Sequence, residues 1–98
     1  MTFQRFDLTG KVALVTGGAG LLGKQHTEAL LESGAFVYVA DINNDAAKVF
    51  CDRLGGKAAP IHLNVADAEN VQECLNTVLS ESGAIDILVN NAAIDPKV

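Results

Sequence analysis

Basic residues are scarce in this 98-residue sequence, where seven lysines and arginines stand against twelve acidic residues and the net charge is −5. This balance argues against a surface for nucleic acid or for an anionic membrane, because both require clustered positive charge. No run approaches the ~20 apolar residues of a transmembrane helix, and residues 1–7 contain no apolar signal core. We therefore expect a cytoplasmic protein with neither nucleic acid nor membrane as a partner.

Cysteine and histidine are equally few. Cys51 and Cys74 lie far apart and form no CxxC pair, so we expect two reduced, semi-buried thiols. His26 and His62 have no further metal ligand at helical spacing or nearby, and we predict no metal site. The sequence also lacks G-x-x-x-x-G-K-[ST], which excludes a P-loop NTPase, and it lacks the G-x-S-x-G nucleophile elbow.

Short apolar runs alternate with stretches of helical periodicity along the rest of the chain. An uninterrupted apolar run suits a strand that is buried on both faces of a parallel sheet. We expect strands over 12–16, 35–40, 59–63 (with Pro60 at its start) and 85–89, and helices over 21–33, 43–54 and 67–82.

The predicted helix boundaries follow from capping residues. Gly34 is expected to end the first helix and Gly83 the third. Asn43, Asn44 and Asp45 offer cap oxygens for the second helix, and Asp67 offers one for the third. The third helix should bury an apolar stripe made of Val71, Cys74, Leu75, Val78 and Leu79.

The element order β-α-β-α-β-α-β predicts parallel strands joined by right-handed crossovers. The expected fold is α/β: a Rossmann-type three-layer α/β/α arrangement with sheet order 3-2-1-4. The fourth strand would then have an unpaired apolar edge, although it is interior in a full doubly wound sheet. We therefore expect residues 1–98 to be one half-domain of a larger protein, truncated after the fourth strand.

The turn between the first strand and the first helix contains a G-x-G-x-x-G pattern over 18–23. Glycines permit a tight turn without a Cβ to hold a phosphate away, and a helix N-terminus offers unpaired N–H groups and a positive dipole end. Gly23 should let the helix pack closely on the strands. The alternative is a structural turn without a ligand. We predict that the turn binds the pyrophosphate of a dinucleotide through Gly17, Gly18, Ala19, Gly20, Leu21, Leu22 and Gly23.

Asp41 is expected at the end of the second strand, 18 residues after Gly23. This is close to the ~20-residue offset at which an acidic residue accepts the adenosine ribose hydroxyls of NAD. A carboxylate would repel the 2′-phosphate of NADP, and no basic residue follows at Ile42, Asn43 or Asn44. The cofactor is therefore predicted to be NAD, with Asp41 and Ile42 at its adenosine ribose. The alternative is that Asp41 only caps the next helix.

Asparagines follow the third and fourth strands. The Asn64 amide could meet the edge of an adenine, although asparagine at a strand end is equally typical of ordinary turn chemistry. Asn90 and Asn91 could tie strand ends together, and the small residues Ala92 and Ala93 allow a ligand close to the backbone. The sequence does not separate structural from cofactor roles here.

These motifs together resemble the short-chain dehydrogenase/reductases over the whole chain: the lead-in Asp7-Leu8-Thr9-Gly10-Lys11-Val12-Ala13-Leu14-Val15-Thr16-Gly17-Gly18, then Asp41, Asn64-Val65 and Leu88-Val89-Asn90-Asn91-Ala92. The resemblance implies that residues 1–98 are an NAD-binding Rossmann half-domain. It assigns the pyrophosphate to Gly17–Gly23, NAD selection to Asp41, the adenine to Asn64-Val65, and sheet stabilisation and the nicotinamide-side ribose to the segment from Asn90 through Asn91 and Ala92 to Ala93.

The sequence departs from the family pattern at three places. Its glycines read TGxxGxxG, as in the epimerase/dehydratase branch, whereas the single-domain dehydrogenases have TGxxxGxG with glycine where Leu21 stands. Asn64 replaces the usual Asp, and Ala93 replaces the usual Gly. The lead-in and the Asn-Asn-Ala segment are similar to the dehydrogenase branch, which we favour.

Family catalysis uses a later Tyr-x-x-x-Lys pair, and Tyr38, the only tyrosine, is followed four residues on by Ile42. We therefore assign no catalytic residue and expect the 98-residue chain to be inactive alone. The resemblance implies an NAD(H)-dependent oxidoreductase of alcohols or carbonyls, a homo-oligomer at full length. The alternatives are a sugar-nucleotide epimerase or dehydratase, a non-catalytic NAD-binding redox sensor, and a module that binds partners through the fourth-strand edge.

Overall fold

Four parallel strands form one sheet in the order β3-β2-β1-β4. The computed structural model describes residues 7–91. Strands and helices alternate as β1 (Val12–Thr16), α1 (Leu21–Glu32), β2 (Phe36–Asp41), α2 (Asn44–Asp52), β3 (Ala58–His62), α3 (Ala68–Ser82) and β4 (Ile87–Asn90). The predicted Rossmann-type fold and its 3-2-1-4 sheet order are confirmed.

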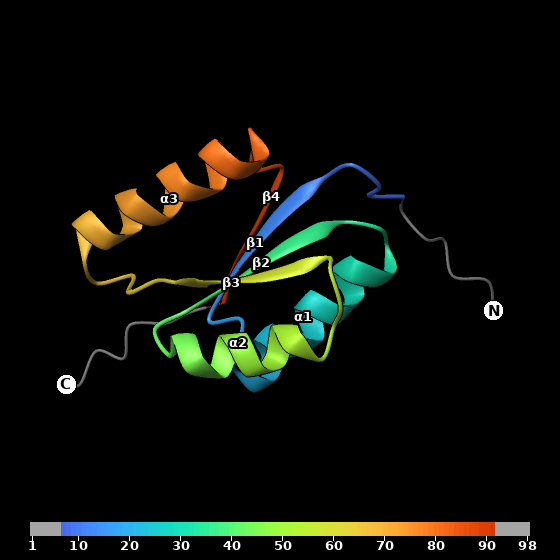
Figure 1. The fold of residues 1–98 in the computed structure, drawn as a ribbon, viewed down its shortest axis with the longest axis horizontal. Coiled ribbons are helices and arrows are strands. Elements are labelled where there is room, and N and C mark those ends of the chain that lie inside the picture. The colour runs from blue at the N-terminus through green and yellow to red at the C-terminus, as the bar shows by residue number, and fades with distance from the viewer. Residues whose placement is uncertain (1–6, 92–98) are drawn as a thin grey trace.

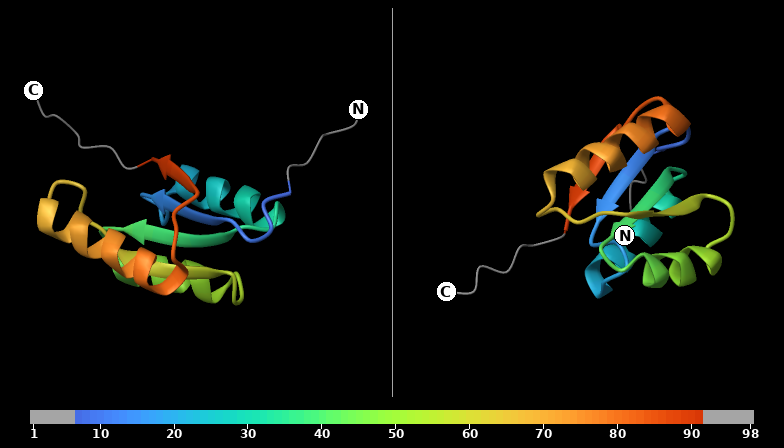
Figure 2. Two further views of the ribbon diagram at one scale, coloured as in Figure 1. Left: turned by 90° about the horizontal axis from the view of Figure 1, so that it is seen from above. Right: turned by 60° about the vertical axis from the view of Figure 1, so that its left-hand side comes forward.

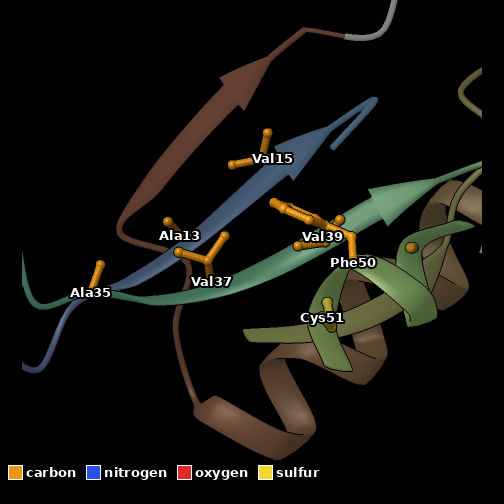
Figure 3. Packing of buried hydrophobic residues seen from close by; sticks show 8 residues of the cluster. Ala13, Val15, Ala35, Val37, Val39, Phe50 and Cys51 are labelled. Atoms are coloured by element: carbon orange, nitrogen blue, oxygen red, sulfur yellow. The ribbon is translucent and has the colours of Figure 1, made fainter. Parts of the chain in front are cut away.

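The helices cover both faces of the sheet, with α1 and α2 on one side and α3 on the other (Figures 1 and 2). Successive side chains of a strand point to opposite faces of the sheet. Because the strands are apolar on both faces, each face needs a covering helix. Val15 and Val37 face α2, where they pack with Phe50 and Cys51 (Figure 3). Leu14 and Tyr38 face α3, where Cys74 and Val78 complete a second cluster.

The strand register gathers the predicted site at one edge of the sheet. Thr16, the last residue of β1, lies beside Ala40 of β2 and Asn90 of β4. Because the strands are parallel, their carboxyl ends lie together at one end of the sheet. The loop after β1 lies there between β2 and β4, and the helices that connect the strands on these two sides cover opposite faces of the sheet (Figure 1). Open α/β sheets bind ligands at such a crossing point.

The predicted caps are present. The Asn43 side chain accepts a hydrogen bond from the N–H of Ala46 at 3.0 Å and caps α2. Asp67 accepts from the N–H groups of Glu69 and Asn70 and caps α3. These short polar side chains satisfy N–H groups that a helix start leaves without a partner.

Two details differ from the expectation. Because β3 begins at Ala58, Pro60 is its third residue, inside the strand and not at its start, and lies opposite Val39. The sheet tolerates it because β3 is an edge strand, where a missing N–H costs no ladder bond. Leu79 is 48% exposed, whereas Cys74 and Val78 are buried. The face of α3 that packs on the sheet therefore contains fewer residues than the predicted stripe, because Leu79 does not belong to it.

Candidate functional site

The glycine-rich turn is closed by tight contacts that leave no room for a Cβ at Gly18 or Gly23. Gly17 has a φ of +64°, which favours glycine, and its carbonyl accepts from the N–H of Gly20 at 3.1 Å. A Cβ on Gly23 would overlap the Gly17 carbonyl, whereas a Cβ on Gly18 would lie 2.7 Å from the Val39 side chain. Gly23 thus packs against the turn itself and not against the strands as expected; Gly18 makes the close approach to β2.

The N-terminus of α1 has no internal cap, unlike those of α2 and α3. Gly20 is its N-cap residue and supplies no side-chain hydrogen bond, and its first turn contains no acidic residue. The first helical hydrogen bond runs from the N–H of Lys24 to the carbonyl of Gly20, at 2.9 Å. The N–H groups of Leu21, Leu22 and Gly23 therefore precede the helical ladder. Such a terminus binds anions, phosphates above all.

The amides before the helix are used within the protein. Gly18 donates to the carbonyl of Ala40 at 3.1 Å, and Ala19 donates to Oδ2 of Asp41 at 3.0 Å. Together with the Gly20 bond, these contacts fix the turn against the end of β2. The predicted pyrophosphate residues thus divide into Gly17–Gly20, which shape the turn, and 21–23, whose amides precede the first helical hydrogen bond.

Asp41 ends β2 directly beside the turn. Its Oδ2 binds Ala19, and its Oδ1 accepts from the N–H of Asn43 at 2.9 Å. Asp41 does not cap α2, because Asn43 does. An ionised carboxylate has about four acceptor positions, so it can still accept hydroxyl groups. The neighbouring Ile42 is 64% exposed.

Asn91 connects the end of β4 to the turn. Its side-chain Nδ2 donates to the Gly17 carbonyl at 3.3 Å, and its backbone N–H donates to Thr16 Oγ1 at 2.9 Å. Thr16 Oγ1 in turn lies 3.2 Å from Oδ1 of Asn90. The predicted sheet-tying role of this segment is therefore visible. Ala92 and Ala93 lie outside the described residues.

Thr16 was not among the predicted site residues, although it stands at the centre of this network. A hydroxyl residue immediately before a glycine turn, at the end of a buried strand, was the available signal. The role of Thr16 depends on its pairing with Asn90. This pairing could not be predicted, because the two residues are 74 positions apart in the sequence.

Asn64 is engaged in turn chemistry. Its Oδ1 accepts from the N–H of Ala66 at 3.0 Å, and its own N–H donates to Oδ1 of Asn70. Val65 lines an apolar cavity of about 300 Å³ with Leu88 and Cys74, which reaches Thr16 at the edge of the sheet. Of the predicted pair, Asn64 has a local structural role, and Val65 faces the cavity.

Three large apolar side chains are exposed around the turn and Asp41. Leu21 is 79% exposed, Leu22 58% and Ile42 64%. Ligand sites combine such apolar surface with a few placed polar groups. The N–H groups of the α1 terminus and the Asp41 carboxylate are the polar groups here.

A metal-ligand group and the Tyr38 hydroxyl were the remaining features to place within residues 7–91. Their His, Cys, Asp and Glu side chains form no group that could hold a metal ion. Tyr38 is 3% exposed, and its hydroxyl contacts Ser82 Oγ at 2.6 Å and Glu81 at 3.1 Å. Burial raises the pKa of Tyr38. Within the same range, no helix has the length and apolar character needed to cross a bilayer.

The fold and the glycine turn define a Rossmann-type domain, and comparison with known proteins identifies its family. Residues 11–98 match the family model described as short chain dehydrogenase. The chain belongs to this family.

The similarity extends to individual members. The chain is 44% identical over 87 residues to a sorbitol dehydrogenase of Cereibacter sphaeroides and 41% identical over 87 residues to a tropinone reductase-like protein of Erythroxylum coca. A Brucella melitensis 3-ketoacyl-(acyl-carrier-protein) reductase, crystallised with NADH, superposes with a TM-score of 0.84 at 32% identity. Each match covers 89% of this chain but only 34%, 32% and 36% of these proteins, respectively. The chain thus spans about a third of their length.

Proposed function

We propose that this chain binds NAD(H) at the glycine turn as the cofactor-binding part of an oxidoreductase of alcohol or carbonyl substrates. The observation that carries the proposal is the uncapped N-terminus of α1 beside the Asp41 carboxylate. The amides of residues 21–23 would hold the pyrophosphate, and Asp41 the adenosine ribose hydroxyls. The bound nicotinamide would supply hydride transfer.

A preference for NAD over NADP is proposed from the charge around Asp41. No basic residue follows at Ile42, Asn43 or Asn44 to bind a 2′-phosphate, and the carboxylate would repel one. The NADH bound by the Brucella reductase is compatible with this proposal.

Residues that bind and convert the substrate would lie in the part of a full-length protein that these 98 residues do not include. The match to the short chain dehydrogenase model favours this activity over that of a sugar-nucleotide epimerase. We propose that the 98-residue chain binds cofactor without turning over substrate, and that a full-length form would be a cytoplasmic homo-oligomer. Measurable alcohol dehydrogenase activity of the 98-residue chain alone would contradict the first of these proposals.

Calorimetric titration with NADH tests the site when the same substitution is made at two exposed leucines, one in the proposed site and one outside it. Leu22 and Leu79 are 58% and 48% exposed on different helices. Leu22→Asp adds negative charge to the first turn of α1, which favours the helix but repels a pyrophosphate. We expect it to weaken NADH binding by about 10-fold or more, while Leu79→Asp leaves binding unchanged. Wild-type affinity in Leu22→Asp would overturn the proposed site.

A further inference from the structure

Asp41 joins the end of β2 to the glycine turn through a hydrogen bond with Ala19. We infer that Asp41 is a positioning residue for the turn, in addition to its proposed contact with the ribose. The inference rests on the proposed function for its consequence in binding, but the contact itself involves only this chain. It predicts that Asp41 affects affinity for a ligand that has no ribose.

The Ala19 bond is the only one of the turn's three amide contacts, among the described residues, whose acceptor is a side chain. Gly18 donates to the backbone carbonyl of Ala40, and Gly20 to that of Gly17. Substitution cannot delete backbone acceptors, whereas replacing Asp41 deletes the acceptor of Ala19. Ala19 lies two residues before the first residue of α1, so its orientation sets the direction in which the first helical amides point.

The carboxylate is suited to this position. A hydrogen bond to an ionised acceptor is roughly twice as strong as a neutral one, and the positive end of α1 favours a nearby anion. Ala19 and Asn43 each take one acceptor position on separate oxygens. About two positions then remain for hydroxyl groups, so Asp41 can hold the turn and a ribose simultaneously.

This double role has a consequence for cofactor preference. Replacing Asp41 by a neutral residue removes the repulsion of a 2′-phosphate but also releases Ala19. Affinity for NADPH should therefore gain little, while affinity for the pyrophosphate part falls for every dinucleotide. If Asp41 only selected the ribose, its replacement would instead lower the affinity for NADH and raise the affinity for NADPH.

The test compares Asp41→Ala with Asp45→Ala. Asp45 is exposed in the first turn of α2, so its replacement removes the same charge nearby without touching the turn. Amide hydrogen exchange is measured by NMR without ligand, and inorganic pyrophosphate, which has no ribose, is titrated separately. We expect Asp41→Ala to accelerate exchange at Ala19 by about 10-fold and to weaken pyrophosphate binding by a similar factor. Asp45→Ala should change neither, and the amide of Val39 should stay protected in both variants.

Unchanged exchange at Ala19 in a folded Asp41→Ala protein would overturn the inference, even if NADH binding is lost. If Asp41→Ala does not fold, Asp41→Asn replaces it, since one amide oxygen cannot serve both donors in the same way. The amide of Ala19 or Asn43 must then exchange faster, and protection of both would equally overturn the inference. Failure of the wild type to bind NADH would contradict the proposed function alone, because the exchange measurement needs no cofactor.

Discussion

The side chain of Asn91 donates to the carbonyl oxygen of Gly17 at 3.3 Å, across 74 positions of sequence. The same carbonyl accepts from Gly20 within the turn. The loop that follows β1 is therefore hydrogen-bonded to both neighbouring strands, through Asn91 directly after β4 and through Asp41 at the end of β2.

Asn91→Ala should weaken NADH binding more than it weakens the fold. It removes one partly buried hydrogen bond, which contributes about 1 kcal/mol to stability, but it also frees the turn on its β4 side. We expect about a 5-fold loss of affinity by calorimetry. Asn76→Ala is the matched control, because the Asn76 amide oxygen accepts a hydrogen bond from exposed Gln72 on α3, away from the turn. Equal affinities of the two variants would show that Asn91 does not position the turn.

Gly23→Ala should lower both stability and NADH affinity. Alanine normally favours a helix over glycine by about 1 kcal/mol, but its Cβ would overlap the Gly17 carbonyl. Overpacking against backbone should cost about 1–3 kcal/mol, measured by urea unfolding. Gly56→Ala is the control, since a Cβ there meets nothing within 4 Å. A Gly23→Ala protein as stable as the wild type would mean that α1 can shift away from the turn.

Thr27→Val should stabilise the fold. Thr27 is 0% exposed, and its hydroxyl oxygen has no hydrogen-bond partner among residues 7–91. Removing an unsatisfied buried hydroxyl at nearly constant volume should add about 1 kcal/mol to the free energy of unfolding. Thr77→Val, at an exposed position of α3, should change the free energy of unfolding by less than about 0.5 kcal/mol. Destabilisation by Thr27→Val would show that the hydroxyl is hydrogen-bonded in solution.

Stability should fall at alkaline pH partly through Cys51. Burial, with a smaller contribution from the charge of Asp52, raises the pKa of Cys51 from its ordinary value of 9.0 to about 11. Between these values the unfolded chain ionises the thiol and the folded chain does not, so the stabilising contribution present below pH 9.0 is lost as pH rises towards 11. Urea unfolding across this interval should show a steeper decline for the wild type than for Cys51→Ala. Parallel declines would exclude Cys51 as a source.

The element order was predictable because each strand is an apolar run between glycine or cap residues. Val12–Thr16 and the caps Asn43 and Asp67 are local signals of this kind. Contacts that depend on which strands become neighbours were not predictable. The pairing of Thr16 with Asn90 and the packing of Gly23 on Gly17 both require the folded turn.

The glycine spacing illustrates the same limit. Leu21 stands where glycine was expected for the dehydrogenase branch, so the glycine spacing opposed the branch that the other motifs favoured. In the structure Leu21 begins α1 with its side chain exposed, so the turn closes without glycine there. The close approaches are made by Gly18 and Gly23, a distinction that spacing alone does not contain.

The central claim is that the turn and Asp41 form a site for NAD. The affinities of the wild-type chain for NADH and for NADPH, measured separately, test this claim most directly. Calorimetric titration should give NADH the higher affinity, by about 10-fold or more, because the Asp41 carboxylate would accept ribose hydroxyls and would repel a 2′-phosphate. Equal affinities, or tighter binding of NADPH, would contradict the account.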